Sequence, residues 1–240
     1  TLKKGASLSA QHGYYGYRQN GSGGIEVQDG ACLKIEKFFY LSGLTQIDNG
    51  TGSFLQSGGT VSANCTLYLA GPSPATSSAQ STGVYTLAGG VLVINAPEGQ
   101  EGIANGIGKG AFHFGKGTLV TNALAIDLEN VNGGNFSPAG DEITGTTHLT
   151  GKKPRTYRQG AGGKMTITLA SKNDHDRLMW NTQNGSSVVI EKGAVFEIVF
   201  LRNYRPKSGD VFTIITADRI ELKGDPVIRV EGRPFKAQVL

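Results

Sequence analysis

Three segments of the chain repeat one pattern of glycine, aromatic and aliphatic residues. They span residues 52–64, 83–95 and 110–122, and they share the pattern G-x-aromatic-x-x-x-(G/K)-G-x-(V/L)-x-x-N. A unit of this length cannot bury a hydrophobic face alone, whereas stacked units bury a continuous core. The spacing of the copies suits one coil of a solenoid, in which each unit contributes about one turn.

A second repeat links two distant parts of the chain, residues 25–35 and 188–198. Both read apolar-x-apolar-x-x-G-A-x-apolar-x-apolar. Alternating apolar residues give each strand one inward face, and a glycine between strands allows a tight corner with positive φ. In the third copy of the first repeat, the same alternation directs His113 away from Phe112 and Phe114. Both repeats thus predict short strands joined by glycine corners.

The amino-acid composition supports a β fold. Glycine accounts for 36 of the 240 residues, about twice its usual share of roughly 7%. Collagen is excluded because there are only 8 prolines and no three-residue glycine period. A long helical bundle is disfavoured because glycine inside a helix costs about 1 kcal/mol relative to alanine. We therefore expect an all-β fold, a right-handed parallel β-helix of roughly seven to nine coils with loop insertions.

We expect this β-helix to form one domain over residues 1–240. Its parts would be repeat coils in 1–150, a basic glycine-rich loop in 151–164 and a C-terminal closing module in 165–240. Insertions in a solenoid lie on one face, often the face that binds a ligand. Three polar segments rich in glycine or proline fit this description: 72–81, 97–109 and 130–141.

Charge and hydropathy exclude several classes of partner. The net charge of +4 is too small to indicate binding to nucleic acid. No apolar run approaches the roughly 18 residues of a membrane helix, so we expect no membrane insertion by this segment. The chain begins at Thr1 without a signal-peptide pattern, which indicates a removed leader or an excised piece. No phosphate-binding loop follows the paired glycines, and we expect no cofactor.

The C-terminal third carries a family resemblance. A strand at 165–169, a turn with the pattern D-x-L at 173–178, a glycine-led strand at 193–198 and a P-x-x-G-D-x-F-x-I segment at 205–217 follow one another. This order resembles the closing module of secreted bacterial β-solenoids, the autotransporter-passenger-like proteins that include PEP-CTERM-type surface proteins. The glycine-aromatic repeats resemble the autotransporter-associated strand repeats of the same proteins. The resemblance implies secretion to a cell surface or extracellular matrix. It does not supply an active site.

Two acidic clusters are candidate sites. Carboxylates beside a histidine could perform acid–base chemistry or bind a cation, as in Asp174, His175, Asp176 and Arg177. A solvated turn is favoured there, because Asn-Asp sequences bond to their own backbone. A calcium site between coils could be formed by Asp127, Glu129, Asp141 and Glu142. Ordinary surface is favoured for these residues, because the G-G-x-G-x-D repeats of calcium β-rolls are absent.

A basic stretch is a candidate site for an acidic polysaccharide. It comprises Tyr157 and the cations Lys152, Lys153, Arg155, Arg158 and Lys164. Because these cations fall in one glycine-rich segment, the favoured interpretation is a solvated loop. The alternative, charge neutralisation of uronates, would need cations on the strand face of several coils.

Aromatic residues near the N-terminus are a second candidate. Tyr14, Tyr15 and Tyr17, with His12 and Arg18, could stack on sugar rings. They could equally cap the coil stack or form a subunit contact, which is the favoured interpretation.

The two cysteines, Cys32 and Cys65, both fall in strand-like segments. They could form a disulfide across adjacent β layers, or they could remain two small buried thiols, which is the more common state. No zinc-type spacing is present.

These observations predict a non-enzymatic, secreted structural or adhesive module. Its partners would be further copies of itself, stacked head to tail, or other surface proteins. The alternative is a carbohydrate-active β-helix protein, either a lyase or hydrolase or a glycan-binding module. The catalytic alternative predicts a groove on one strand face, lined by acidic, basic and aromatic residues from three or more coils.

Overall fold

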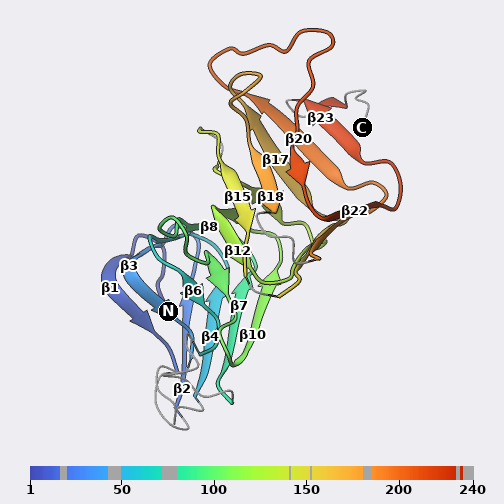
Figure 1. The fold of residues 1–240 in the computed structure, drawn as a ribbon. Helices are drawn as coiled ribbons and strands as arrows, with labels where there is room; N and C mark the ends of the chain where they lie inside the picture. The colour runs from blue at the N-terminus through green and yellow to red at the C-terminus, as the bar shows by residue number, and fades with distance from the viewer. Residues whose placement is uncertain are drawn as a thin grey trace.

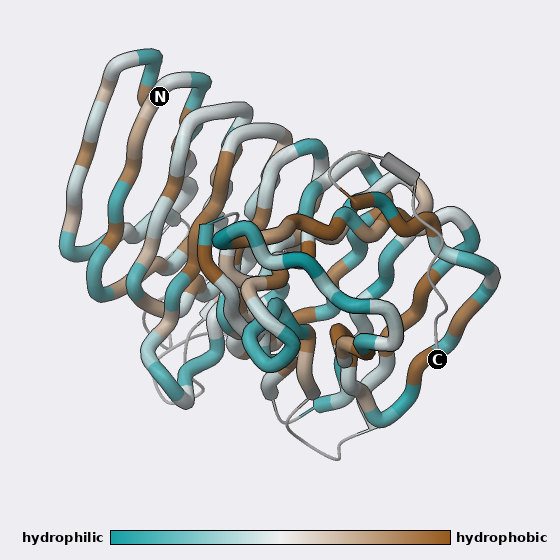
Figure 2. Tube along the Cα trace, turned by 90° about the horizontal axis from the view of Figure 1, so that it is seen from above, coloured by the Kyte–Doolittle hydropathy of each residue, from teal (hydrophilic) through white to brown (hydrophobic). Residues whose placement is uncertain are grey.

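The chain folds as an all-β parallel β-helix of about seven turns (Figure 1). The computed structural model describes residues 1–16, 21–42, 50–71, 80–140, 142–151, 153–180, 185–230 and 233–234. Within these residues there is no helix. The coils follow one another from the N-terminal half, blue to green, to the C-terminal half, orange to red. Figure 2 shows neighbouring coils side by side like the turns of a spring.

Each coil has three strand positions, which form three faces of the β-helix. The first face consists of β2 (Ser22–Val27), β4 (Thr51–Gln56), β7 (Thr82–Leu87) and β10 (Lys109–Phe114), followed by β13 (Leu128–Asn130), β16 (Thr156–Gln159), β19 (Ser187–Ile190) and β22 (Arg219–Leu222). These eight strands form two separate four-stranded sheets, because β10 does not pair with β13.

The second and third faces belong to one 16-stranded sheet. The second face consists of β1 (Ser7–Tyr14), β3 (Cys32–Tyr40), β5 (Thr60–Ala63), β8 (Val91–Ile94), β11 (Thr118–Thr121), β14 (Asn135–Ser137), β17 (Lys164–Leu169), β20 (Val195–Phe200) and β23 (Val227–Val230), with β24 (Arg233–Pro234) antiparallel to β23. The third face consists of the ends of β1 and β3, then β6 (Leu67–Tyr68), β9 (Ile103–Ala104), β12 (Ala123–Ala125), β15 (Thr146–Leu149), β18 (Arg177–Trp180) and β21 (Ile215–Thr216).

The glycine-aromatic repeat is confirmed as three successive coils in register. Gly83 on β7 lies between Gly52 on β4 and Gly110 on β10. In each copy the aromatic side chain follows this glycine closely, and the three rings stack inside the helix. The ring centroids of Phe54 and Tyr85 are 4.6 Å apart, and those of Tyr85 and Phe112 are 5.4 Å apart. Each repeat copy therefore adds one ring to an internal column.

The repeated glycine has a steric cause. A Cβ atom at Gly83 would lie 1.6 Å from the carbonyl oxygen of Leu69, far inside van der Waals contact. At Gly52 the same atom would lie 1.4 Å from the carbonyl oxygen of Leu41. Only glycine lets the backbone of one strand position approach that of the preceding one so closely. The first two copies of the repeat thus share one backbone contact, whereas a Cβ atom at Gly110 would meet the side chains of Leu69 and Asn105.

The second repeat is also confirmed as strand, corner and strand. It corresponds to β2 and β3 near the N-terminus and to β19 and β20 near the C-terminus. The corner glycines have positive φ, 70° at Gly30 and 76° at Gly193. The alanines that follow them, Ala31 and Ala194, are buried. The same corner therefore leads from the first face to the second face at both ends.

The core contains a few polar side chains that are paired inside the helix. The hydroxyl of Tyr85 donates a hydrogen bond to Oε1 of the fully buried Gln56 at 2.7 Å. In the C-terminal half, Nδ2 of Asn130 donates to Oε1 of Gln159 at 3.0 Å, and the hydroxyl of Tyr157 donates to the same oxygen. Buried polar groups are tolerated when they are bonded in this way.

The expected loops differ in part from the structure. Segment 97–109 contains β9, segment 130–141 contains β14, and segment 151–164, expected as a basic loop, contains β16. These corrections share one cause, because the three strands are very short and sit between turn residues. Most of the loop at 72–81 lies outside the described residues.

Coil length changes sharply at one point. Along most of the second face, neighbouring coils pair residues about one repeat apart in sequence, as Thr60 pairs with Val91. Between β11 and β14, Thr118 pairs with Asn135, which is little more than half that distance along the chain. This short coil coincides with the gap between β10 and β13 on the first face.

The glycine contact can be tested by Gly83→Ala. The added Cβ meets backbone that belongs to a neighbouring strand position, so the coil must deform, and we expect a loss of about 3 kcal/mol in the free energy of unfolding. Urea denaturation followed by circular dichroism measures this loss. Gly99→Ala is the control, because its added Cβ would have no atom within 4 Å. Only the positive φ at this position disfavours alanine, at a cost of about 1 kcal/mol in the free energy of unfolding. Equal stability of Gly83→Ala and wild type would contradict the described stacking.

Candidate functional site

Five aromatic side chains gather on the outside of the first coils. They are called the aromatic patch: His12, Tyr14, Phe38, Tyr40 and Tyr68. His12 of β1 pairs with Phe38 of β3, and Tyr14 pairs with Tyr40, which pairs with Tyr68 of β6. The patch therefore crosses three neighbouring strands of the third face.

Strand alternation places these rings outside. Phe39, between Phe38 and Tyr40, is completely buried and packs on the inner column at Phe54. Its neighbours must point away from the core. The side chain of Phe38 is 42% exposed, which is high for a phenylalanine. Ring centroids of adjacent patch residues are 5.0 to 5.7 Å apart, so the rings form one continuous surface.

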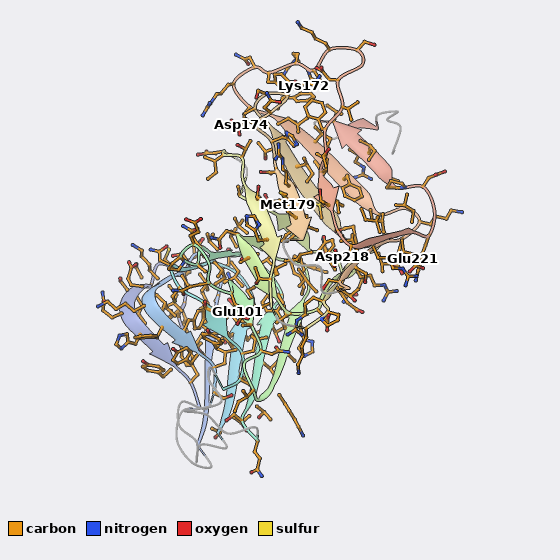
Figure 3. The ribbon with its side chains drawn as sticks, in the orientation of Figure 1. Glu101, Lys172, Asp174, Met179, Asp218 and Glu221 are labelled. Carbon is orange, nitrogen blue, oxygen red and sulfur yellow. The ribbon has the colours of Figure 1, made fainter. Side chains whose placement is uncertain are left out.

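Polar groups border the aromatic patch. Glu36, which precedes Phe38 on β3, accepts hydrogen bonds from Nζ of Lys34 at 2.7 Å and from Nδ2 of Asn64 at 2.9 Å. On the other side, Glu101 is close enough to Tyr68 for its charge to help raise the pKa of that phenol, after burial. Glu101 is labelled in Figure 3 on the N-terminal half of the molecule. The patch thus combines flat apolar rings with carboxylate and amide groups at its rim.

The structure divides the predicted tyrosine cluster. Tyr14 belongs to the aromatic patch, whereas Tyr15 points inward, 5.7 Å from Phe54 between ring centroids, and burial raises the pKa of its hydroxyl. Tyr17 lies outside the described residues. Sequence reasoning missed Phe38, Tyr40 and Tyr68, which complete the surface that Tyr14 begins.

The structure does not gather the predicted basic stretch into one site. Arg158 lies on β16 and forms ion pairs with Glu129 and with Glu191, at 3.5 and 2.5 Å. The bond to Glu191 raises the pKa of Arg158. Lys164 begins β17 on a different face, Lys153 is exposed and Arg155 is half-buried. Lys152 lies outside the described residues.

The expected solvated turn at 174–177 is wrong for its central residues. Asp176 is completely buried, and His175 is 7% exposed. The carboxylate of Asp176 accepts hydrogen bonds from the backbone N–H of Gly145 at 2.8 Å and of Thr168 at 2.9 Å. It thereby ties a loop and the end of β17 to the start of β18. This carboxylate has a structural role, because its two oxygens are occupied by backbone donors.

A cleft of about 310 Å³ lies beside this segment. Its lining includes Lys172, His175, Arg177 and Met179; Lys172 and Met179 are labelled in Figure 3. Burial lowers the pKa of His175, and Nε of Arg177 donates to its Nε2 at 3.3 Å. Lys172 is paired with Asp210 at 3.6 Å. Arg177 is thus engaged with His175, and Lys172 with Asp210.

A second cleft, of about 320 Å³, opens at the gap between β10 and β13. Its lining includes Phe112, His113, Asp127, Glu129 and Asn132. His113 is exposed on the outside of β10, as its alternation with Phe112 and Phe114 predicts. Within the described part of the chain, no group of three or more histidine, cysteine or acidic side chains is arranged to hold a metal ion. Asp141 of the candidate calcium site lies outside that part.

The row of ion-paired residues and the aromatic patch do not share one strand face. The row Glu129 and Arg158, extended by Glu191, lies along the first face, whereas the aromatic patch lies on the third face. These two sets of residues therefore do not form one common groove.

The two cysteines are free thiols. Cys32 is exposed at the start of β3, where it pairs with Thr60 of the next coil. Ala63, just before Cys65 in sequence, pairs with Ile35 of β3. Ile35 lies about 10 Å beyond Cys32 along the same strand. Because disulfide Cα atoms lie within about 7 Å of each other, the bridge left open by the sequence does not form. Burial raises the pKa of the Cys65 thiol to about 11.

Comparison of the chain with protein-family models, curated proteins and solved structures gives no match. In the described residues, no helix has the length and apolar character needed to cross a membrane.

The structural role of Asp176 can be tested by Asp176→Ala. Loss of the carboxylate leaves two backbone N–H groups without an acceptor, and we expect the free energy of unfolding to fall by about 3 kcal/mol. Asp225→Ala is the matched control, because the Asp225 side chain is exposed and should change stability by less than about 0.5 kcal/mol. A catalytic or ligand-binding role would instead leave stability nearly unchanged.

The aromatic patch predicts a distinctive alkaline titration. Burial, with smaller effects from Tyr68 and Tyr14, raises the pKa of Tyr40 from its ordinary value near 10 to about 12. A folded-state pKa above the unfolded value stabilises the protein below pH 10, and this contribution is lost as pH rises towards 12. We expect the tyrosinate absorbance step above about pH 11 to shrink in Tyr40→Phe. An unchanged titration curve would contradict the burial of Tyr40.

Proposed function

We propose that the protein is a non-catalytic adhesive module that binds neutral polysaccharide through the aromatic patch. The observation that supports this function is the continuous outward surface of His12, Tyr14, Phe38, Tyr40 and Tyr68 across three in-register strands. Exposed apolar surface of this kind is unusual in a folded protein unless it binds a partner.

Stacked rings on a rigid sheet suit a sugar chain. The faces of aromatic rings pack against the apolar C–H faces of sugars, while tyrosine hydroxyls at the ring edges can bond to sugar hydroxyls. Parallel strands lie about 4.8 Å apart, so a chain running along the stack meets a new ring at each strand. Because the strands hold the rings in place before binding, little side-chain entropy is lost on association.

The rim groups favour a neutral ligand over an acidic one. Glu101 lies close to Tyr68, where it would repel a polyuronate but accept hydrogen bonds from hydroxyls, whereas the charge of Glu36 is paired with Lys34. No residue of the predicted basic stretch belongs to the patch, and Arg158 is neutralised by two glutamates. The proposal therefore differs from the polyanion site considered for residues 152–164.

The cellular setting is part of the proposal. Its support is the resemblance of residues 165–217 to the closing module of secreted autotransporter-passenger-like β-solenoids, together with the β-helix itself. An adhesive module of this type would act at a cell surface or in an extracellular matrix.

Head-to-tail self-association is a second candidate function. Leu8 on β1 and Ile220 on β22 occupy inward positions of their ladders, yet they are 43% and 45% exposed at the two ends of the stack. Exposed ladder residues beside unpaired strand edges can pair with another copy. Sedimentation velocity at increasing concentration tests this candidate, and a monomer throughout would exclude it.

The patch can be tested by sedimentation with insoluble neutral polysaccharides such as cellulose, chitin and galactan. We expect Phe38→Ala and Tyr40→Ala each to weaken binding at least tenfold, because each removes a stacking surface. Leu55→Ala is the matched control, since Leu55 is 39% exposed on β4 of the first face and should not alter binding. Circular dichroism verifies that all variants are folded.

Salt dependence separates stacking from charge attraction. Binding through the aromatic patch should persist at about 0.5 M NaCl, where interactions between exposed charges are screened. Binding only to alginate or pectate, with loss at high salt and on Lys153→Ala, would overturn the proposal in favour of the basic stretch. Binding to neutral polysaccharide that is equal in wild type and Phe38→Ala would also overturn it.

A further inference from the structure

The internal column of rings ends at the gap in the first face. Phe54 and Tyr85 are buried, with rings stacked at 7°, and Phe112 stacks on Tyr85 at 20°. The next strand, β13, does not pair with β10, and no ring among the described residues stacks on the far side of Phe112. Phe112 is consequently only half-buried and lines the cleft of about 320 Å³.

Hydrogen-bonding groups surround this open ring. His113 and Thr86 come from β10 and β7 on one side, and Asp127, Glu129 and Asn132 come from β13 and its flanks on the other. Oδ1 of Asp127 accepts a hydrogen bond from the backbone N–H of Thr156 at 2.8 Å, which fixes the carboxylate. Its other oxygen, Oδ2, makes no hydrogen bond within the described residues.

The cleft has the size and chemistry of a site for one sugar ring. Small-molecule pockets begin at about 300 Å³, so this cleft of about 320 Å³ is large enough for one ring. An apolar aromatic surface with a few convergent polar groups fits the two kinds of surface that a hexopyranose presents. Carboxylate, amide, imidazole and hydroxyl groups together can accept from and donate to neighbouring sugar hydroxyls.

We propose that the cleft between β10 and β13 binds a single neutral hexopyranose, with its C–H face on Phe112 and its hydroxyls on Asp127 and Glu129. This inference rests on the proposed function and deepens it by adding a second site for the same class of ligand. It uses none of the residues of the aromatic patch. The patch lies on the third face and takes an extended chain, whereas the cleft lies on the first face and takes one sugar unit.

An organic cation fits the cleft less well. Glu129 is already paired with Arg158 at 3.5 Å, and Arg158 is shared with Glu191. The cleft therefore keeps only one carboxylate, Asp127, without a cationic partner among the described residues. A neutral polyol can bind without an unpaired negative charge in the cleft, whereas an ammonium group needs one.

The test is titration of the full chain with methyl glycosides of glucose, galactose and mannose, followed by NMR and calorimetry. We expect at least one glycoside to bind and to shift the His113 ring signals. Phe112→Leu keeps an apolar side chain but removes the flat ring, and Glu129→Gln removes the charge. Each should raise the Kd at least tenfold. Glu221→Gln is the matched control, because Glu221 lies in the same outward row of the first face and should leave the Kd within twofold.

The two sites fail separately. Phe38→Ala should weaken polysaccharide binding at least tenfold yet leave glycoside binding intact, and Glu129→Gln should weaken glycoside binding at least tenfold yet leave polysaccharide binding intact. The inference is overturned if no glycoside binds, or if Glu129→Gln binds as well as wild type. It is also overturned if lysine amide, a protonated amine, binds more tightly than every neutral glycoside. Unfolding curves verify that Phe112→Leu is folded. If Phe112→Leu proves unstable, Glu129→Gln alone still tests the inference.

Discussion

The β-helix depends on close backbone contact between successive strand positions at glycine. Where Gly83 meets the carbonyl oxygen of Leu69, no side chain fits. This contact fixes the position of β7 along the axis of the β-helix. The position of β7 sets the register that stacks Tyr85 between Phe54 and Phe112. The same register fixes the outer surface, because alternate residues of each strand face outward. The aromatic patch follows from the matching register of β1, β3 and β6.

Much of the fold could be predicted because the repeats carry their own register. The spacing of Gly52, Gly83 and Gly110 indicated three coils, and the Gly-Ala corners indicated the turn between the first and second faces. The third face could not be predicted from the sequence, because β6 and β9 are too short to show any periodicity. The patch could have been found from the coil spacing, because the offset that pairs Cys32 with Thr60 also pairs Tyr40 with Tyr68.

Charged residues could not be assigned from the sequence because their roles depend on distant segments. Asp176 resembles a turn residue, yet it is buried because Gly145 and Thr168 converge on it from other parts of the β-helix. Arg158 resembles a loop cation, yet it lies on a strand between two glutamates from neighbouring coils. In both cases a partner lies about one coil away in sequence, and no local pattern records it.

The two proposed binding surfaces lie where regular stacking ends or changes. The coil between β11 and β14 is shortened, and the first face cannot continue from β10 to β13. The ring of Phe112 is left without a neighbour at that step, so a residue that would be core in a regular coil becomes the floor of a cleft. Lengthening this coil to restore pairing would cover Phe112 and close the cleft, while leaving the aromatic patch on the third face unchanged. The irregular coil length is thus the feature that distinguishes the proposed pocket for one ring from the proposed surface for a chain.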